Sequence, residues 1–221
     1  MLKPSISGHF PTIARKVLPP FLAAIRKNNA RLYMSTRVAI RLMLLIFVRS
    51  SELRTAPWSE INLNTGEWIT PWQRMKRGKL AVAPDTTDHH VCLPRQGLEL
   101  LRELRTYTGG SPYLFPSQRD HHKPMGGDAI RMALNRMGYE GKMTTHGFRA
   151  LAMTTLKESL GYLHEVVYRQ LAHAQKDKIA SAYDRAQFLE ERKKMMQRWA
   201  DYLDGVEGGA VIAGRFGQSA A

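Results

Sequence analysis

The segment STRVAIRLMLLIFV, residues 35–48, is followed directly by RSSELR, residues 49–54. Apolar side chains occupy most positions of the first segment, which predicts a helix at the centre of the core. A short helix is predicted within the second segment, capped by Ser50 or Ser51, because a serine hydroxyl accepts a hydrogen bond well at a helix N-terminus. Arg49 therefore lies at the junction of two predicted helices.

Apolar residues at helical spacing occur on both sides of this region, beginning at residues 18–28 and returning after residue 96. The part between them is different. Residues 58–70 have strand-like composition around the turn Asn64-Thr65-Gly66, which predicts a β-hairpin, and residues 73–82 and 90–93 are candidates for further strands. The later predicted helices lie at residues 97–107, 128–137, 145–159, 164–172 and 187–203.

The predicted fold is therefore α+β: mainly helical, with a small antiparallel β-sheet inserted near residues 58–93. Composition divides the chain into three parts. Residues 1–16 predict a linker or an arm that leads into the domain, residues 17–204 predict one folded domain, and the Gly- and Ala-rich residues 205–221 predict a flexible tail.

Cysteine usage and hydropathy exclude several classes of protein. Cys92 is the only cysteine, so an internal disulfide and a metal site of several thiolates are excluded. The most apolar run, residues 42–48, is far too short to span a bilayer, and the N-terminus lacks the pattern of a signal peptide. We expect a cytoplasmic protein with no membrane association.

The charge of the chain is strongly positive. Thirty-three Lys and Arg residues against nineteen Asp and Glu residues give a net charge of +14 with neutral histidines. Such an excess attracts polyanions, of which nucleic acid is the most abundant in a cell. The alternative is a generally basic, well-solvated surface.

Arg49 and the pair His146 and Arg149 are candidates for phosphate chemistry. At a helix junction, the guanidinium of Arg49 can reach a cleft while Glu52, three residues later, holds it in place; the alternative is an ordinary surface cation at a helix end. His146 and Arg149 open a predicted helix at spacing i, i+3, so they share one face. An imidazole can move a proton and a guanidinium can neutralise a phosphate.

Three more residues are candidates for the same site. Lys76 lies in RMKRGK, residues 74–79, on a predicted β-turn from which an ammonium group can donate a proton. His173 follows a predicted helix, and Tyr183 follows ten residues later. Taken alone, the lysine is more simply a basic turn in contact with solvent or phosphate, and a tyrosine on a short helix normally packs against the core.

In this order along the chain, these residues resemble the tyrosine recombinase family, the phage integrases, and especially the integrases of prophages and genomic islands. The resemblance covers residues 9–204. The residues that match the catalytic positions of the family, with Glu52 as the supporting acid, are Arg49, Lys76, His146, Arg149, His173 and Tyr183. The segment between residues 79 and 91 is longer than is usual in the family, so Lys79 is an alternative to Lys76.

The resemblance implies a site-specific recombinase whose Tyr183 forms a 3′-phosphotyrosine and releases a 5′-hydroxyl. Arg49 and Arg149 would stabilise the transition state, His146 would act as general base, and His173 would bind a non-bridging oxygen. Lys76 would protonate the leaving oxygen. Because the arginines and the lysine supply the positive charge, no metal, cofactor or ATP is required.

The expected partner is double-stranded DNA at attachment sites, with Arg74, Arg77 and Lys79 as further DNA-binding residues. The resemblance also implies a monomer alone, a tetramer when synapsed on DNA, and possible regulation by a directionality factor, in the bacterial nucleoid. Full-length members of the family carry N-terminal DNA-binding domains, and we expect this chain to be a fragment that lacks them.

Three other functions compete with this one: a type IB topoisomerase-like enzyme or telomere resolvase, a non-catalytic DNA-binding remnant, and a metal hydrolase built on His89, His90, His121 and His122. Adjacent histidines in loops are usually solvated, which disfavours the hydrolase. A further choice concerns the apolar stripe after the tyrosine, which packs either on its own core or on a neighbouring protomer. Its members are Phe188, Met195, Met196, Trp199 and Leu203.

Overall fold

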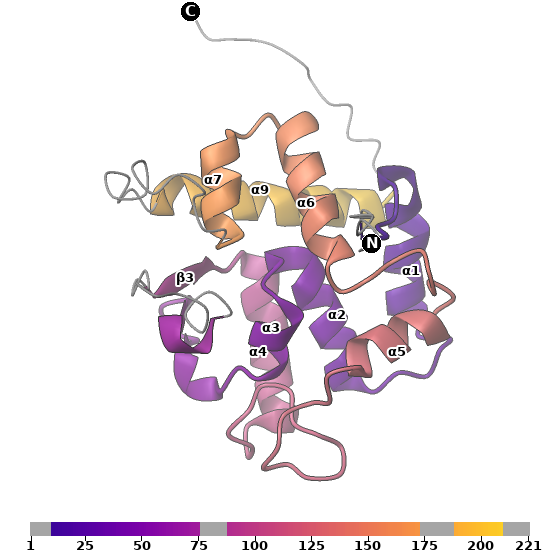
Figure 1. The fold of residues 1–221 in the computed structure, drawn as a ribbon, viewed down its shortest axis with the longest axis vertical. Coiled ribbons are helices and arrows are strands. Elements are labelled where there is room, and N and C mark those ends of the chain that lie inside the picture. Colours follow the sequence, from indigo (N-terminus) through magenta and orange to yellow (C-terminus); the bar gives the residue numbers. More distant parts are fainter. Residues whose placement is uncertain (1–9, 76–87, 173–187, 210–221) are drawn as a thin grey trace, which may run out of the picture.

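The computed structural model describes residues 10–75, 88–172 and 188–209. Helix α2 (Met34–Ile46) lies at the centre and contacts helices on several sides. Figure 1 shows α6 and α7 above α2, α9 extending behind them and α5 below to the right. The helices around α2 are α1 (Leu18–Lys27), α3 (Ser50–Arg54), α4 (Arg95–Thr108), α5 (Ala129–Arg136), α6 (Gly147–Glu158), α7 (His164–Gln170) and α9 (Leu189–Glu207), with short 3-10 helices η1 (Arg15–Val17), η2 (Trp58–Glu60) and η3 (Trp72–Arg74).

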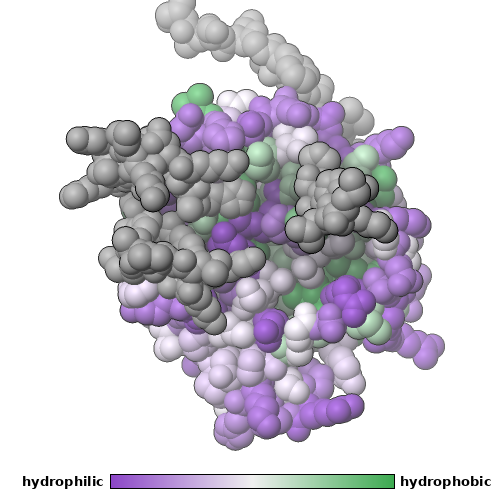
Figure 2. All heavy atoms as spheres, viewed as in Figure 1, coloured by the Kyte–Doolittle hydropathy of each residue, from purple (hydrophilic) through white to green (hydrophobic). Residues whose placement is uncertain are grey.

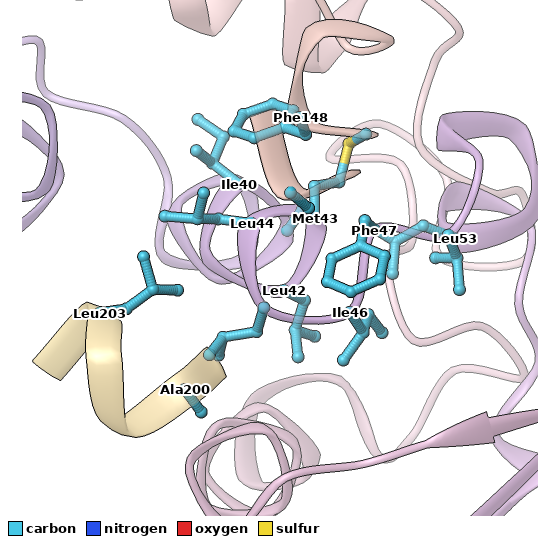
Figure 3. Packing of buried hydrophobic residues seen from close by; sticks show 14 of the residues in the cluster. Ile40, Leu42, Met43, Leu44, Ile46, Phe47, Leu53, Phe148, Ala200 and Leu203 are labelled. Carbon is cyan, nitrogen blue, oxygen red and sulfur yellow. The ribbon is translucent and has the colours of Figure 1, made fainter. Parts of the chain in front are cut away.

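The apolar composition of α2 explains its central position. Ten of its residues are buried. Figure 3 shows some of them beside residues of three other helices. Phe148 approaches from α6, Leu53 from α3, and Leu203 from α9. Truncating one such leucine to alanine would cost about 2–5 kcal/mol, because it leaves a cavity among close-packed neighbours. The helix predicted at residues 35–48 is confirmed, although it ends two residues earlier.

Helix α2 ends because the backbone of Phe47 is left-handed, with φ +42°. This conformation costs a non-glycine residue about 1–2 kcal/mol, and the burial of the Phe47 ring in the core offsets the cost. The chain turns sharply there, and α3 begins at Ser50. The predicted serine cap was wrong, since the N-cap residue of α3 is Arg49.

The predicted hairpin is confirmed, within a three-stranded antiparallel sheet of order β1-β2-β3. Its strands are β1 (Ile61–Asn62), β2 (Glu67–Thr70) and β3 (His89–Cys92). Trp68 of β2 pairs with Val91 of β3, and both side chains are buried. Residues 73–75 do not form the strand predicted at 73–82, because η3 begins after Pro71; the rest of that prediction falls outside the described residues.

Helix α9 packs on the core of its own chain. Trp199 is fully buried and its indole N–H donates to the carbonyl oxygen of Leu44 at 2.9 Å. Met195, Met196 and Leu203 are also buried. The helix continues to Glu207, past the predicted domain end at residue 204, and the Glu207 carboxylate pairs with Arg41 at 3.2 Å.

Candidate active site

Arg49 is held by Glu52. The Arg49 guanidinium Nη1 lies 2.9 Å from Glu52 Oε1, and the Arg49 backbone N–H donates to Glu52 Oε2 at 3.1 Å. The Glu52 side chain is 4% exposed and that of Arg49 is 22% exposed. The carboxylate thus fixes both the backbone and the side chain of Arg49, while part of the guanidinium remains accessible. The ion pair is the one expected from the spacing of Arg49 and Glu52 in the sequence, and a catalytic role for the pair remains a prediction.

Arg149 lies in the first turn of α6 and is almost fully buried. Its Nη1 donates to the carbonyl oxygen of Phe47 at 2.7 Å, and its Nη2 donates to that of Leu171 at 2.6 Å. Burial, followed by the positive charge of Arg49, lowers the pKa of Arg149 to about 10, and Glu52 acts in the opposite direction. With a pKa of about 10 the guanidinium stays charged at neutral pH. Its Nε is buried without a hydrogen-bond partner among the described atoms.

The end of α7 brings the two arginines together. Arg49 Nη2 donates to the carbonyl oxygen of Ala172 at 3.3 Å, and Leu171, which accepts from Arg149, is the preceding residue. Ala172 has φ +49°, so the helix stops there in a left-handed conformation. Two guanidiniums and one carboxylate therefore meet at this turn, although they come from segments separated by about a hundred residues.

His146 is the residue before the first residue of α6. Thr144 Oγ1 accepts a hydrogen bond from the Gly147 backbone N–H at 3.0 Å, which satisfies one of the unpaired amides at a helix start. The backbone N–H of Arg149 donates to the His146 carbonyl at 3.1 Å. The His146 side chain is exposed, and its ring centroid lies 4.4 Å from that of Phe10. One helix start thus carries an accessible imidazole and a buried guanidinium.

Arg74 uses its guanidinium within the chain. Its Nε and Nη2 bind the two carboxylate oxygens of Glu60 at 2.5 and 2.6 Å. Its Nη1 donates to the carbonyl oxygen of Glu52 at 2.7 Å and to Thr55 Oγ1 at 2.9 Å. These bonds tie the end of the sheet region to α3. A contact between Arg74 and DNA remains a prediction.

The other predicted site residues fall outside the described parts of the chain: Lys76, Arg77, Lys79, His173 and Tyr183. Within the described ranges, no group of three or more His, Cys, Asp or Glu side chains is placed to hold a metal ion, and no helix is long and apolar enough to cross a membrane.

Figure 2 shows that hydrophilic residues cover most of the visible face, with a hydrophobic area near its middle.

Sequence reasoning missed Arg192. This side chain is fully buried in α9, and its Nε donates to Gln170 Oε1 at 3.0 Å while its Nη2 donates to the carbonyl oxygen of His90. Burial lowers the pKa of Arg192, with Cys92 acting in the opposite direction. Arg192 precedes Met195 by three residues and so belongs to the same apolar stripe, a position that indicates burial.

The chain is similar to known proteins of one family over most of its length. The model of the phage integrase family matches residues 12–190. IntB of Escherichia coli (strain K12) is 38% identical over 204 residues, which is 89% of this chain and 51% of that protein. The integrase of Enterobacteria phage P4 is 37% identical over 203 residues, 89% of this chain and 46% of that protein. Prophage integrase IntA of the same E. coli strain is 34% identical over 204 residues, which is 92% of this chain and 47% of that protein.

A solved structure shows the same fold. The crystal structure of XerA recombinase aligns with a TM-score of 0.54 over 89% of this chain and 61% of that chain, at 19% sequence identity. The mainly helical fold with a small antiparallel sheet, predicted from the sequence, is therefore confirmed. The chain spans about half the length of the curated relatives it matches. From the extent of the family match and the identity to these relatives, the chain belongs to the phage integrase family.

Proposed function

We propose that this chain is the strand-cleaving domain of a site-specific DNA recombinase that works through a covalent tyrosine intermediate. The observation that carries the proposal is the meeting of Arg49 and Arg149 at consecutive carbonyl oxygens beside buried Glu52. Two guanidiniums that bind neighbouring carbonyl oxygens repel each other. A phosphate diester is negatively charged, so its binding would relieve the repulsion. Guanidinium groups also match the oxygens of a phosphate in geometry.

The chemistry is an in-line displacement at phosphorus. The phenol oxygen of Tyr183 forms a bond to phosphorus, and the bond between phosphorus and the 5′ oxygen breaks. Charge that develops on the non-bridging oxygens is stabilised by Arg49 and Arg149. The result is a 3′-phosphotyrosine and a 5′-hydroxyl. Because the phosphoester link is retained, a 5′-hydroxyl from another strand can reverse the step without ATP.

Proton transfer accompanies both bond changes. A phenol has an ordinary pKa of about 10, so Tyr183 needs a base, and His146 accepts its proton. Lys76, or Lys79 if the longer hairpin segment displaces Lys76, donates a proton to the leaving 5′ oxygen. His173 donates a hydrogen bond to a non-bridging oxygen. The exposed position of the His146 imidazole supports this assignment, since a base must reach the phenol.

The partner in this proposal is double-stranded DNA, and the net charge of +14 supports it. We propose a tetramer for the synapsed state, with a monomer in the absence of DNA, and integration or excision of a mobile element as the outcome. The packing of α9 on its own chain is consistent with a stable monomer.

A trapping experiment tests the proposal. The chain is incubated with a pool of nicked suicide duplexes whose central sequence is randomised, so that the short fragment carrying the free 5′-hydroxyl diffuses away and the covalent complex accumulates. Denaturing gels, sequencing of the trapped DNA and mass spectrometry of the peptide then identify the site and the nucleophile. We expect the adduct on Tyr183, its loss in Tyr183→Phe, and its retention in Tyr107→Phe, where Tyr107 is an exposed residue of α4.

Three results would contradict the proposal. An adduct formed by Tyr183→Phe would refute the nucleophile. Relaxation of plasmid DNA with no preference among trapped sequences would favour a topoisomerase-like activity. DNA binding with no adduct in any sequence would favour a non-catalytic DNA-binding protein.

A further inference from the structure

The segment at residues 10–13 lies against the start of α6. Both the backbone N–H and Oγ1 of Thr144 donate to the carbonyl oxygen of Pro11, each at 3.2 Å. In the other direction, Thr12 Oγ1 donates to the carbonyl oxygen of Gly147 at 2.9 Å. Ile13 is buried in the core and anchors the segment. These bonds join residues more than 130 positions apart in sequence and lie on both sides of His146.

Gly147 makes this close approach possible. A Cβ atom at this position would lie 2.4 Å from the Pro11 carbonyl oxygen and 3.3 Å from the Thr12 Cα. The first distance is well inside van der Waals contact, and its partner is a backbone atom that cannot rotate away. The glycine next to His146 is therefore required by the segment that crosses it.

Phe10, the first residue of this segment, places its phenyl ring against the His146 imidazole. The ring centroids of Phe10 and His146 are 4.4 Å apart and the rings are inclined by 50°. Phe10 is 58% exposed and is one of the few large apolar side chains among the described residues that are mostly exposed to solvent. Contact with an imidazole covers part of a phenyl ring that water would otherwise surround, and it restricts rotation of the histidine side chain.

We propose that residues 10–12 are a positioning strap for His146, in which Phe10 holds the imidazole in the orientation needed for proton transfer. The inference rests on the proposed function, in which His146 receives the proton of Tyr183. A general base must bring one ring nitrogen within hydrogen-bond distance of the phenol, so an imidazole that rotates freely would spend less time in the reactive orientation. The strap fixes the backbone on both sides of His146, and the phenyl ring fixes the side chain.

The first test compares three variants of the full chain in the trapping assay at saturating DNA. Phe10→Ala should lower the rate of adduct formation about tenfold and leave the DNA dissociation constant unchanged within about twofold. Phe10→Tyr, which keeps the ring, should restore the rate. Tyr107→Ala removes an equally exposed aromatic side chain from α4 and should have no effect. Equal rates for Phe10→Ala and the parent chain would overturn the proposal.

The second test does not depend on activity. A phenyl ring at this distance shifts the resonances of the imidazole protons through its ring current. The His146 Cδ2–H and Cε1–H signals, assigned by comparison with His146→Gln, should move in Phe10→Ala and return close to their original positions in Phe10→Tyr. Unchanged signals in Phe10→Ala would show that the ring contact is absent in solution, which also overturns the proposal.

The two proposals fail in different ways. If His146→Gln forms the adduct at the parent rate, the role of His146 in the proposed function is wrong, whatever Phe10 does. If His146→Gln is slow but Phe10→Ala is not, the strap is wrong and the proposed function stands. Gly147→Ala provides a check from the other side of the strap: it should reproduce both the slower rate and the altered His146 signals, and parent-like behaviour would contradict the strap.

Discussion

Arg149 and Arg49 donate hydrogen bonds to consecutive backbone carbonyl oxygens, those of Leu171 and Ala172, at 2.6 and 3.3 Å. The shared acceptor is the left-handed turn that ends α7. A change at this turn therefore reaches both guanidiniums at once. This geometry explains how two like charges remain together: carbonyl dipoles and the Glu52 carboxylate offset part of their repulsion.

Arg149→Lys should lose adduct formation although it keeps the positive charge. An ammonium group cannot reproduce the planar fork that binds the carbonyl oxygens of Phe47 and Leu171. We expect the rate to fall by about 100-fold or more, as for the loss of an oxyanion donor. The free energy of unfolding, measured in urea, should fall by about 1–3 kcal/mol, because buried carbonyl oxygens lose their donors.

Arg131→Lys is the matched control for this change. Arg131 is an exposed arginine of α5 that pairs with Asp128 at 3.0 Å, and a surface pair of this kind contributes little. It should behave as the parent chain in both measurements. An Arg149→Lys variant with the parent rate would exclude Arg149 from transition-state stabilisation.

Glu52→Gln should disturb Arg49 while leaving the size of the side chain unchanged. The amide can accept from only one side, so the guanidinium or the backbone N–H of Arg49 loses its partner. We expect unfolding to become easier by about 1–3 kcal/mol and adduct formation to slow about tenfold. The equivalent change at Glu99, which is exposed on α4, should alter neither quantity. A slow rate rescued by higher DNA concentration would assign Glu52 to DNA binding instead.

Much of the fold follows from local sequence patterns. The apolar run of α2 predicts a central helix, and the Asn-Thr-Gly turn at residues 64–66 predicts the hairpin, because both patterns depend on neighbouring residues only. Periodicity could not predict the left-handed backbone at Phe47. That conformation depends on burial of the phenyl ring by helices distant in sequence.

The candidate site was predictable to a similar degree. The pairing of Glu52 with Arg49 follows from their spacing of three residues, and the structure confirms it. The acceptors of Arg149 were not predictable, because backbone carbonyls carry no sequence signature. Arg192 was missed because it lies in EERKK, residues 190–194, a run of charged residues that is typical of a solvent-exposed surface. Its helical spacing to Met195 instead places Arg192 on the buried side of the helix.

Arg192→Leu should weaken both stability and cleavage. Leucine fills part of the volume but leaves Gln170 Oε1 and the His90 carbonyl oxygen without this donor. We expect a loss of about 2–4 kcal/mol in the free energy of unfolding. Gln170 directly precedes Leu171 and Ala172, so the turn that holds the two arginines should also move and slow adduct formation.

A comparison of Arg192→Leu with Trp199→Ala separates these effects. Trp199→Ala should be at least as destabilising, by about 3–5 kcal/mol, because it empties a buried site on the same helix. The Trp199 side chain makes no described hydrogen bond to Gln170. At a temperature where both variants are folded, Trp199→Ala should therefore form the DNA adduct faster than Arg192→Leu. Equal rates would mean that Arg192 acts through stability alone.

Cys92 should report the docking of α9 on β3. Burial raises the pKa of the Cys92 thiol, although Arg192 acts in the opposite direction, and the residue is 7% exposed. At pH 8 the thiolate fraction is therefore below that of an ordinary cysteine, and access is blocked as well. We expect N-ethylmaleimide to label the native chain at least about 100-fold more slowly than the urea-unfolded chain, with Trp199→Ala labelled faster than the parent because α9 opens more often. Labelling of the native parent chain at the unfolded rate would show that α9 does not cover β3 in solution.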